Sequence, residues 1–140
     1  MATTLAQILL RLDAVLKAQP GINTVARGRA EEFNREETPA VNVLLKGEGA
    51  LGAFADDLDE HDVPVELHLH VRDADPYLAV EALHERVHQP IVDDAQLGTL
   101  GVQVRLDGPP TFTDPQDADA TALTKVARYR FRFVTPRNSL

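Results

Sequence analysis

The stretch Val65-Glu66-Leu67-His68-Leu69-His70-Val71-Arg72 decides the fold class of this chain. Its apolar and polar residues alternate strictly, so an extended strand places four aliphatic side chains on one face and four polar ones on the other. A strand with one apolar face belongs to an antiparallel sheet that is covered on one side and solvated on the other. The sequence therefore predicts such a sheet, with helices over its apolar face.

Further segments extend this predicted sheet. Near the C-terminus, apolar residues alternate with arginines over 127–133, and a shorter apolar run follows Pro39 at 40–45. Weaker strand signals lie at 22–26 and 100–106. We therefore expect an α+β fold with a mostly antiparallel sheet of four to five strands.

Two helices are predicted to pack on one face of the sheet. Apolar residues recur at helical spacing over 5–16, and Thr4 with Gln7 fits a capping box at the start. The second helix begins at Asp75-Pro76, because the carboxylate accepts from free amides and proline at the first position loses no hydrogen bond. We expect this helix to end or kink close to Pro90.

Length and composition limit the class of protein. A chain of 140 residues is expected to form one domain, spanning 1–140, with a core of its own. It contains no cysteine, which excludes a disulfide framework, a thiolate zinc site and a cysteine nucleophile. The first residues lack the basic segment and continuous apolar run of a signal peptide, and no segment approaches membrane-spanning length. We therefore expect no membrane association.

Two polar segments are predicted to project from the sheet as loops, at about 47–62 and 107–122. The first is either a plain projecting loop or one with extended ladder arms, and the second is a loop or arm. The first is rich in glycine and acid, and the second combines prolines with aspartates over more residues than a compact domain usually leaves unstructured. Solvated loops would have the same composition. As candidate contacts with another subunit or a partner we single out Asp56, Asp57, Asp59, Glu60, Pro110, Phe112, Asp114 and Asp117.

Charge argues against nucleic acid as a partner. The chain has 22 acidic and 14 basic side chains and a net charge of −8, which opposes non-specific attraction to phosphate. The row Arg128, Arg130 and Arg132 is the local exception. It is either a solvated strand face paired with carboxylates or a contact surface for an acidic partner. If the strand at 65–72 neighbours the last strand, Glu66 lies near this row.

Histidines supply the only chemistry-bearing pattern. The segment His84-Glu85-Arg86-Val87-His88 matches H-E-x-x-H, in which two histidines bind zinc and the glutamate activates water. Arg86 between the histidines and Pro90 after them oppose this interpretation, and the longer H-x-x-G-x-x-H continuation is missing. We expect no metal, cofactor or catalytic residue. A small zinc-dependent hydrolase using His84, Glu85 and His88 stays as an alternative of a different class.

His68 and His70 form a second possible pair of metal ligands, because both point to the same side of one strand. They share that face with Glu66 and Arg72. An exposed polar sheet surface is the simpler explanation for these histidines.

The order of these pieces resembles the tail terminator proteins of long-tailed bacteriophages, of the lambda minor tail protein U type. The resemblance covers nearly the whole chain in order, and each piece alone is a weak signal. Its pieces are Gly28-Arg29 with Phe33, Pro39-Ala40-Val41-Asn42-Val43, the glycine-and-acid loop, Glu66-Leu67-His68-Leu69-His70-Val71, the helix at 81–87 with Pro90 after it, and the final aromatic strand.

The resemblance implies a structural subunit of the virion that closes into a hexameric ring. Such rings sit on the head-proximal end of the tail tube, stop its polymerisation and offer a surface to head-completion and neck proteins. The subunit would be made in the host cytoplasm, and DNA would pass through the ring without specific binding. The family has no catalytic residue or cofactor to carry over. An alternative within the same class is another head-tail adaptor or neck protein, or a minor component of a contractile tail.

Overall fold

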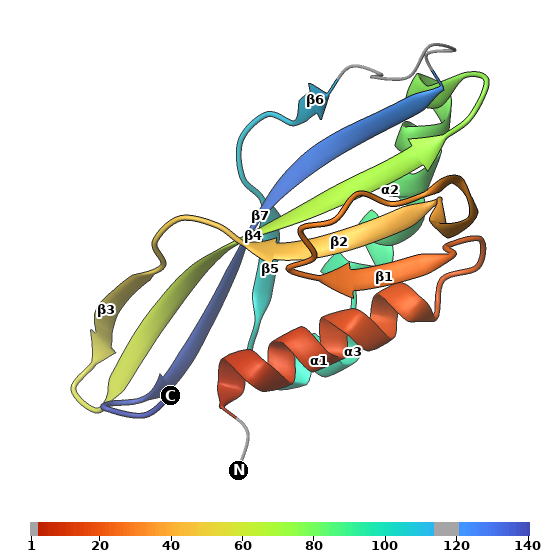
Figure 1. Ribbon diagram of the computed structural model, residues 1–140. Helices are drawn as coiled ribbons and strands as arrows, with labels where there is room; N and C mark the ends of the chain where they lie inside the picture. Colours follow the sequence, from red (N-terminus) through yellow and green to blue (C-terminus); the bar gives the residue numbers. More distant parts are fainter. Residues whose placement is uncertain (1–2, 114–120) are drawn as a thin grey trace.

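A computed structural model describes residues 3–113 and 121–140 of the chain. Within these ranges, seven strands form one sheet of order β1-β2-β4-β7-β5, with β3 paired to β4 and β6 paired to β7 (Figure 1). The pair β1–β2 is parallel and the other described pairs are antiparallel. The strands are β1 (Thr24–Arg27), β2 (Ala40–Leu45), β3 (Ala50–Ala55), β4 (Leu58–Arg72), β5 (Gln103–Leu106), β6 (Thr111–Thr113) and β7 (Ala122–Pro136). The α+β class and the mostly antiparallel sheet are confirmed, but the sheet has more strands than the predicted four to five.

The helices are α1 (Thr4–Lys17), α2 (Pro76–Val92) and the short α3 (Ala95–Thr99), which the sequence did not predict. Thr3, and not Thr4, caps α1, because its hydroxyl accepts from the amide of Ala6 at 3.1 Å. The start of α2 is as predicted, with the Asp75 carboxylate accepting from Leu78 at 3.3 Å. Pro90 does not stop α2, which continues for two residues with Pro90 inside its last turn. A buried side chain just after Pro90, Ile91, holds that turn against the core.

The core lies between the helices and the central strands. Alternate residues of β4 are buried together with the β2 and β7 residues that face them across the ladder, such as Val43 and Ala127 on either side of Leu67. Apolar side chains of α1, α2 and α3 belong to the same cluster, which contains Ile8, Leu12, Leu16, Val80, Leu83, Val87, Ile91 and Leu97. Burial of each such side chain contributes roughly 1.5–3 kcal/mol, so this cluster is the main source of stability.

The two longest strands reach beyond this core. β4 and β7 pair continuously from Leu58 opposite Pro136 to Arg72 opposite Ala122. The first part of β4, the last part of β7 and β3 form an arm that extends past the helices, at the lower left of Figure 1. The predicted projection at 47–62 thus has the form of extended ladder arms, in which only Asp56 and Asp57 separate β3 from β4. Pairing with β7 satisfies the backbone of a segment whose charged sequence looks like a loop.

The second predicted loop, at 107–122, also contains a strand. β6 pairs with β7, with Thr111 opposite Val126 and Thr113 opposite Thr124. Residues 114–120 lie outside the described part of the chain. Within the described residues, this predicted loop or arm therefore includes a short strand at 111–113.

Candidate interaction surface

The predicted arginine row lies on the polar face of the sheet, and acidic side chains accompany it. Arg128 faces Glu66 across the ladder and Arg132 faces Asp62, as the predicted neighbourhood of the two strands requires. The ion pairs are Arg128–Glu66 at 3.3 Å, Arg130–Asp107 at 3.0 Å, Arg130–Asp62 at 3.8 Å, Arg132–Glu60 at 3.5 Å and Arg132–Asp62 at 3.7 Å. The row is thus neutralised within the subunit, and an acidic partner would have to displace these carboxylates.

The four acidic residues predicted as contacts in the first loop divide into two kinds. Asp59 and Glu60 lie on β4 and pair with basic side chains, Asp59 with Arg137 at 3.7 Å and Glu60 with Arg132. Asp56 and Asp57 form the exposed turn at the tip of the arm. Within the described residues, neither of these two carboxylates makes an ion pair. Of the four predicted contacts, these two carboxylates stand free for a contact with another molecule.

The predicted contacts of the second loop lie on the opposite flank of β7. Phe112 on β6 is partly exposed, with Tyr77 of α2 at 6.3 Å between ring centroids and the Lys125 ammonium 5.6 Å above its ring. Pro110 is exposed just before β6. The structure brings neither residue to the tip of the arm. Asp114 and Asp117 lie outside the described residues.

The H-E-x-x-H histidines serve as a polar link between α2 and β7. His84 Nε2 and His88 Nδ1 each lie 2.8 Å from the hydroxyl of Tyr129, a fully buried residue of β7. Burial, then the charges of Lys125 and His88, lower the pKa of His84 to about 4, so this imidazole is neutral at pH 7. Burial raises the pKa of Tyr129, which keeps its hydroxyl protonated.

This arrangement gives the zinc alternative no support. The two imidazole nitrogens are directed at a tyrosine hydroxyl, and Glu85 is exposed to solvent. The described residues contain no group of three histidine, aspartate or glutamate side chains that could hold a metal ion. The pair His68 and His70 is also engaged, with His68 Nε2 at 2.9 Å from Glu66 and His70 Nδ1 at 2.9 Å from Thr124.

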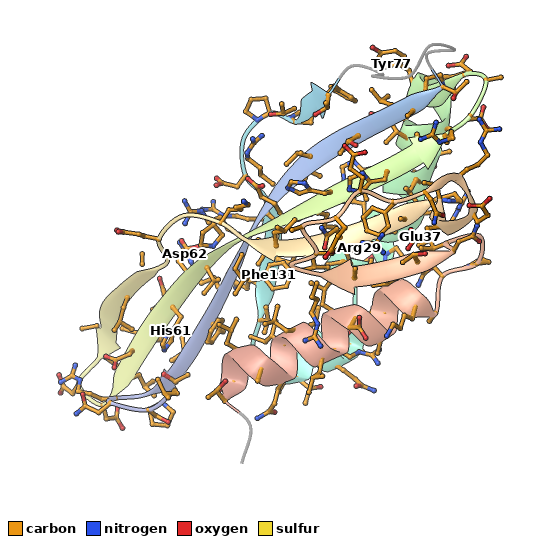
Figure 2. The ribbon with its side chains drawn as sticks, in the orientation of Figure 1. Arg29, Glu37, His61, Asp62, Tyr77 and Phe131 are labelled. Carbon is orange, nitrogen blue, oxygen red and sulfur yellow. The ribbon has the colours of Figure 1, made fainter. Side chains whose placement is uncertain are left out.

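The loop between β1 and β2 covers part of the polar face of the sheet, and the resemblance residues hold it there. The Arg29 guanidinium bonds Glu37, which lies beside it in Figure 2, at 2.5 and 2.9 Å. It also lies 4.1 Å from the ring centroid of Phe33. Phe33 in turn lies 4.7 Å from the ring of His70, and the Asn42 side chain bonds the Arg29 backbone. Hydrogen bonds from Arg29 and from the Asn34 amide lower the pKa of Glu37 to about 2. These residues therefore stabilise the fold.

A cavity of about 390 Å³ opens beside this loop. Its lining includes Phe33, His70, Arg72 and Thr124. Burial, aided by the charges of His68 and Arg29, lowers the pKa of His70 to about 4, so the imidazole adds no positive charge there at pH 7. Of the predicted contact residues that the structure describes, none lines this cavity.

Sequence reasoning missed the exposed apolar residues at the sheet edges. All six residues of β3 are exposed, including Leu51 at 67% and Phe54 at 59%, and Leu106 on β5 is 51% exposed. The available signal was the uncharged run Ala50-Leu51-Gly52-Ala53-Phe54-Ala55 between two charged segments. It is consistent with an edge strand that carries no charge or proline to block further pairing.

No family model matches the chain, and no curated protein matches it. Among the described helices, none has the length and apolar character needed to cross a membrane.

Proposed function

We propose that this protein is a structural subunit of a bacteriophage tail, a tail terminator that forms a ring on the head-proximal end of the tail tube. The ring, expected to be a hexamer, stops tube polymerisation and presents the surface to which the head-completion and neck proteins attach. The subunit acts in the virion, after assembly in the host cytoplasm. No catalytic step is part of this role.

The observation that carries the proposal is the arm of β3, β4 and β7, which extends beyond the core with exposed apolar residues on its edge strand. A closed ring needs head-to-tail contacts between two different surfaces of the same subunit. A rigid sheet extension offers such a surface at low entropic cost, because its strands are already ordered. The resemblance along nearly the whole chain supplies the tail terminator role.

Charge is compatible with a ring through which DNA passes. Six copies of a chain with net charge −8 carry −48, and the arginine row is paired with carboxylates of the same subunit. A ring of this composition repels the phosphate backbone and does not retain it. A head-tail adaptor or neck protein would share these features, and its partner would be the connector in place of the tube.

Native mass spectrometry and negative-stain microscopy of the full chain, alone and with the tail tube protein of the same virus, test the proposal. We expect hexameric rings, and tubes whose growth stops once the protein is added. A protein that stays monomeric under both conditions and leaves tube growth unchanged would refute it. Rings that bind connector proteins and ignore tubes would instead identify the adaptor.

A further inference from the structure

Together with β5 at its base, the arm forms a four-stranded sheet with two open edges. At its base, β5 pairs with the other side of β7, so the order across the arm is β3-β4-β7-β5. Within the described part of the chain, no strand pairs with the outer edge of β3 or of β5. Unpaired strand edges present rows of free amide and carbonyl groups, which are a template for pairing with another chain.

The directions of these strands suit a head-to-tail array. Each neighbouring pair in the arm is antiparallel, and with four strands the outer two, β3 and β5, run in opposite directions. Rotation about a ring axis leaves the direction of a strand along that axis unchanged. The β3 strand of the next copy therefore runs antiparallel to β5 of the first, and the alternation continues across the junction.

β3 and β5 lie at different positions along the strand direction, so pairing between them shifts one copy relative to the next. Across the four strands, Gln103 of β5, Arg132 of β7, Asp62 of β4 and Ala50 of β3 form one row of directly opposed residues. The start of β5 is therefore level with the start of β3. Pairing β5 with the middle of β3 thus shifts each copy by about three to four residues along the strands. A closed sheet requires such a register shift together with tilted strands.

Apolar side chains of the two edges share one face of the sheet. Leu51 lies level with His61 and Phe133, and Leu106 lies level with Tyr129, so both are on the face that carries the core. Side-by-side pairing of the two edges brings these two exposed leucines onto a common surface. Their mutual burial would add hydrophobic stabilisation to the backbone hydrogen bonds.

The polar face offers charge complementarity. Arg105 on β5 is exposed and, within the described residues, has no acidic partner. On β3, the residues of this face are Ala50 and Gly52, which oppose Asp62 and Glu60 on β4. These short side chains leave room for a long arginine to reach over β3 towards the two carboxylates. Asp62 Oδ1 is buried and accepts no hydrogen bond from the described residues.

We infer that β3 of one copy pairs antiparallel with β5 of the next, so that the arms join into one continuous sheet around the ring. Leu51 packs beside Leu106 of the neighbour, and Arg105 of the neighbour faces Glu60 and Asp62. The occupant of the β3 edge is a second copy of this chain. The inference rests on the proposed function for self-assembly and adds the interface through which it occurs.

Site-directed cross-linking tests the contact directly, because the natural chain contains no cysteine. The variant Gly52→Cys with Gln103→Cys places one thiol on each edge, on the same face, and leaves Leu51, Leu106 and Arg105 unchanged. A Cβ at Gly52 meets no atom within 4 Å. Two strands separate the positions within one copy, a distance of roughly 14 Å, so a short bismaleimide joins only different copies.

The expected result is a ladder of covalent oligomers on a denaturing gel, ending at the size of the ring. The matched control replaces Gly52→Cys with Leu10→Cys, on an α1 residue that is 55% exposed and lies on neither edge. We expect no ladder from this control. Cross-links that join residue 52 to the tube protein, and not to a second copy, would overturn the inference.

Charge reversal provides a second readout by native mass spectrometry. Arg105→Glu should weaken assembly by about tenfold or more, because it places a carboxylate opposite Glu60 and Asp62. Arg27→Glu, the same change at an exposed arginine that ends β1, should leave assembly unchanged. Circular dichroism of both variants checks that the fold is retained.

The outcomes separate this inference from the proposed function. Rings that form without the 52–103 ladder and tolerate Arg105→Glu would overturn the interface and leave the ring function standing. A chain that stays monomeric with and without tube protein would overturn both. A ladder that ends at the ring size, together with loss of rings in Arg105→Glu, supports both.

Discussion

Tyr129 shows how one buried side chain joins a helix to the sheet. Its hydroxyl bonds both histidines of the H-E-x-x-H segment, and the nearby Lys125 ammonium bonds Glu81 of α2 at 2.7 Å. Polar groups in such positions must be paired, because an unpaired one loses its bonds to water without replacement. The histidine spacing that suggests a metal site is used here to reach one tyrosine.

Replacing Tyr129 by phenylalanine should lower stability by about 1–3 kcal/mol, since two partly buried imidazole nitrogens lose their partner. The measurement is the free energy of unfolding from urea titration, monitored by circular dichroism. The matched comparison is the triple variant Tyr129→Phe, His84→Leu, His88→Leu, which removes both sides of the interaction. It should recover part of the loss, because no polar atom is then left unpaired. Equal stability of the wild type and Tyr129→Phe would contradict the role of this link.

The Arg29–Glu37 pair predicts a specific pH dependence. The folded protein holds the pKa of Glu37 at about 2, below the value near 4.5 of an unperturbed glutamate. As pH falls, the unfolded chain therefore binds this proton first, so the stabilisation is complete above about pH 4.5 and is lost between 4.5 and 2. Glu37→Gln should flatten the fall in unfolding free energy over that window, measured by urea titration. Glu36→Gln, at an exposed neighbour, is the control and should keep the wild-type slope.

Among the elements, α3 depends on a contact that spans most of the chain. Asp94 caps α3 by accepting from Leu97 at 2.9 Å, and its two oxygens also bond Arg11 of α1 at 2.7 and 2.9 Å. The side chain of Asp94 is only 8% exposed. One carboxylate thus both starts a short helix and ties it to α1.

We expect Asp94→Ala to destabilise the protein more than Asp75→Ala, which removes only the exposed cap of α2 and should cost about 1 kcal/mol. Asp94→Asn should lie between the wild type and Asp94→Ala, because an amide oxygen still caps α3 while the ion pair is lost. Urea midpoints of the three variants give the order. Equal losses for Asp94→Ala and Asp75→Ala would show that the contact with Arg11 is not stabilising.

The strands that could be predicted are those with one buried apolar face and one solvated polar face. The limits of β2, Ala40–Leu45, match the apolar run, and the alternation at 65–72 and 127–133 identifies the paired parts of β4 and β7 that cover the core. The strand limits and pairing of the arm could not be predicted, because Asp59, Glu60 and Asp62 have no buried face to mark them as a strand. Their pairing depends on a segment some seventy residues away, which local pattern does not contain.

The candidate surface was predicted only where its residues lie on alternating strands. The Arg128–Glu66 neighbourhood follows from two alternating strands and is confirmed, whereas Arg11–Asp94 and Lys125–Glu81 join residues 83 and 44 positions apart with no shared motif. Leu51 and Arg105 are candidates for a contact between copies because β3 and β5 are the two edges of the sheet β3-β4-β7-β5. An exposed edge is a property of sheet order, and sheet order is not visible in a single strand.

For the whole molecule, the charge distribution predicts that the protein does not bind DNA. The net charge is −8, and the three arginines of the row are each bonded to carboxylates on the same face. We expect no binding of a short labelled duplex at low salt, measured by fluorescence anisotropy on the assembled protein. The triple variant Glu60→Gln, Asp62→Asn, Glu66→Gln frees Arg128 and Arg132, while Arg130 keeps its pair with Asp107. It should gain binding that weakens with salt, by a slope of about 0.9 for each phosphate neutralised. Salt-sensitive binding by the wild type would mean that phosphate displaces these carboxylates, and the ring would then hold the DNA that passes through it.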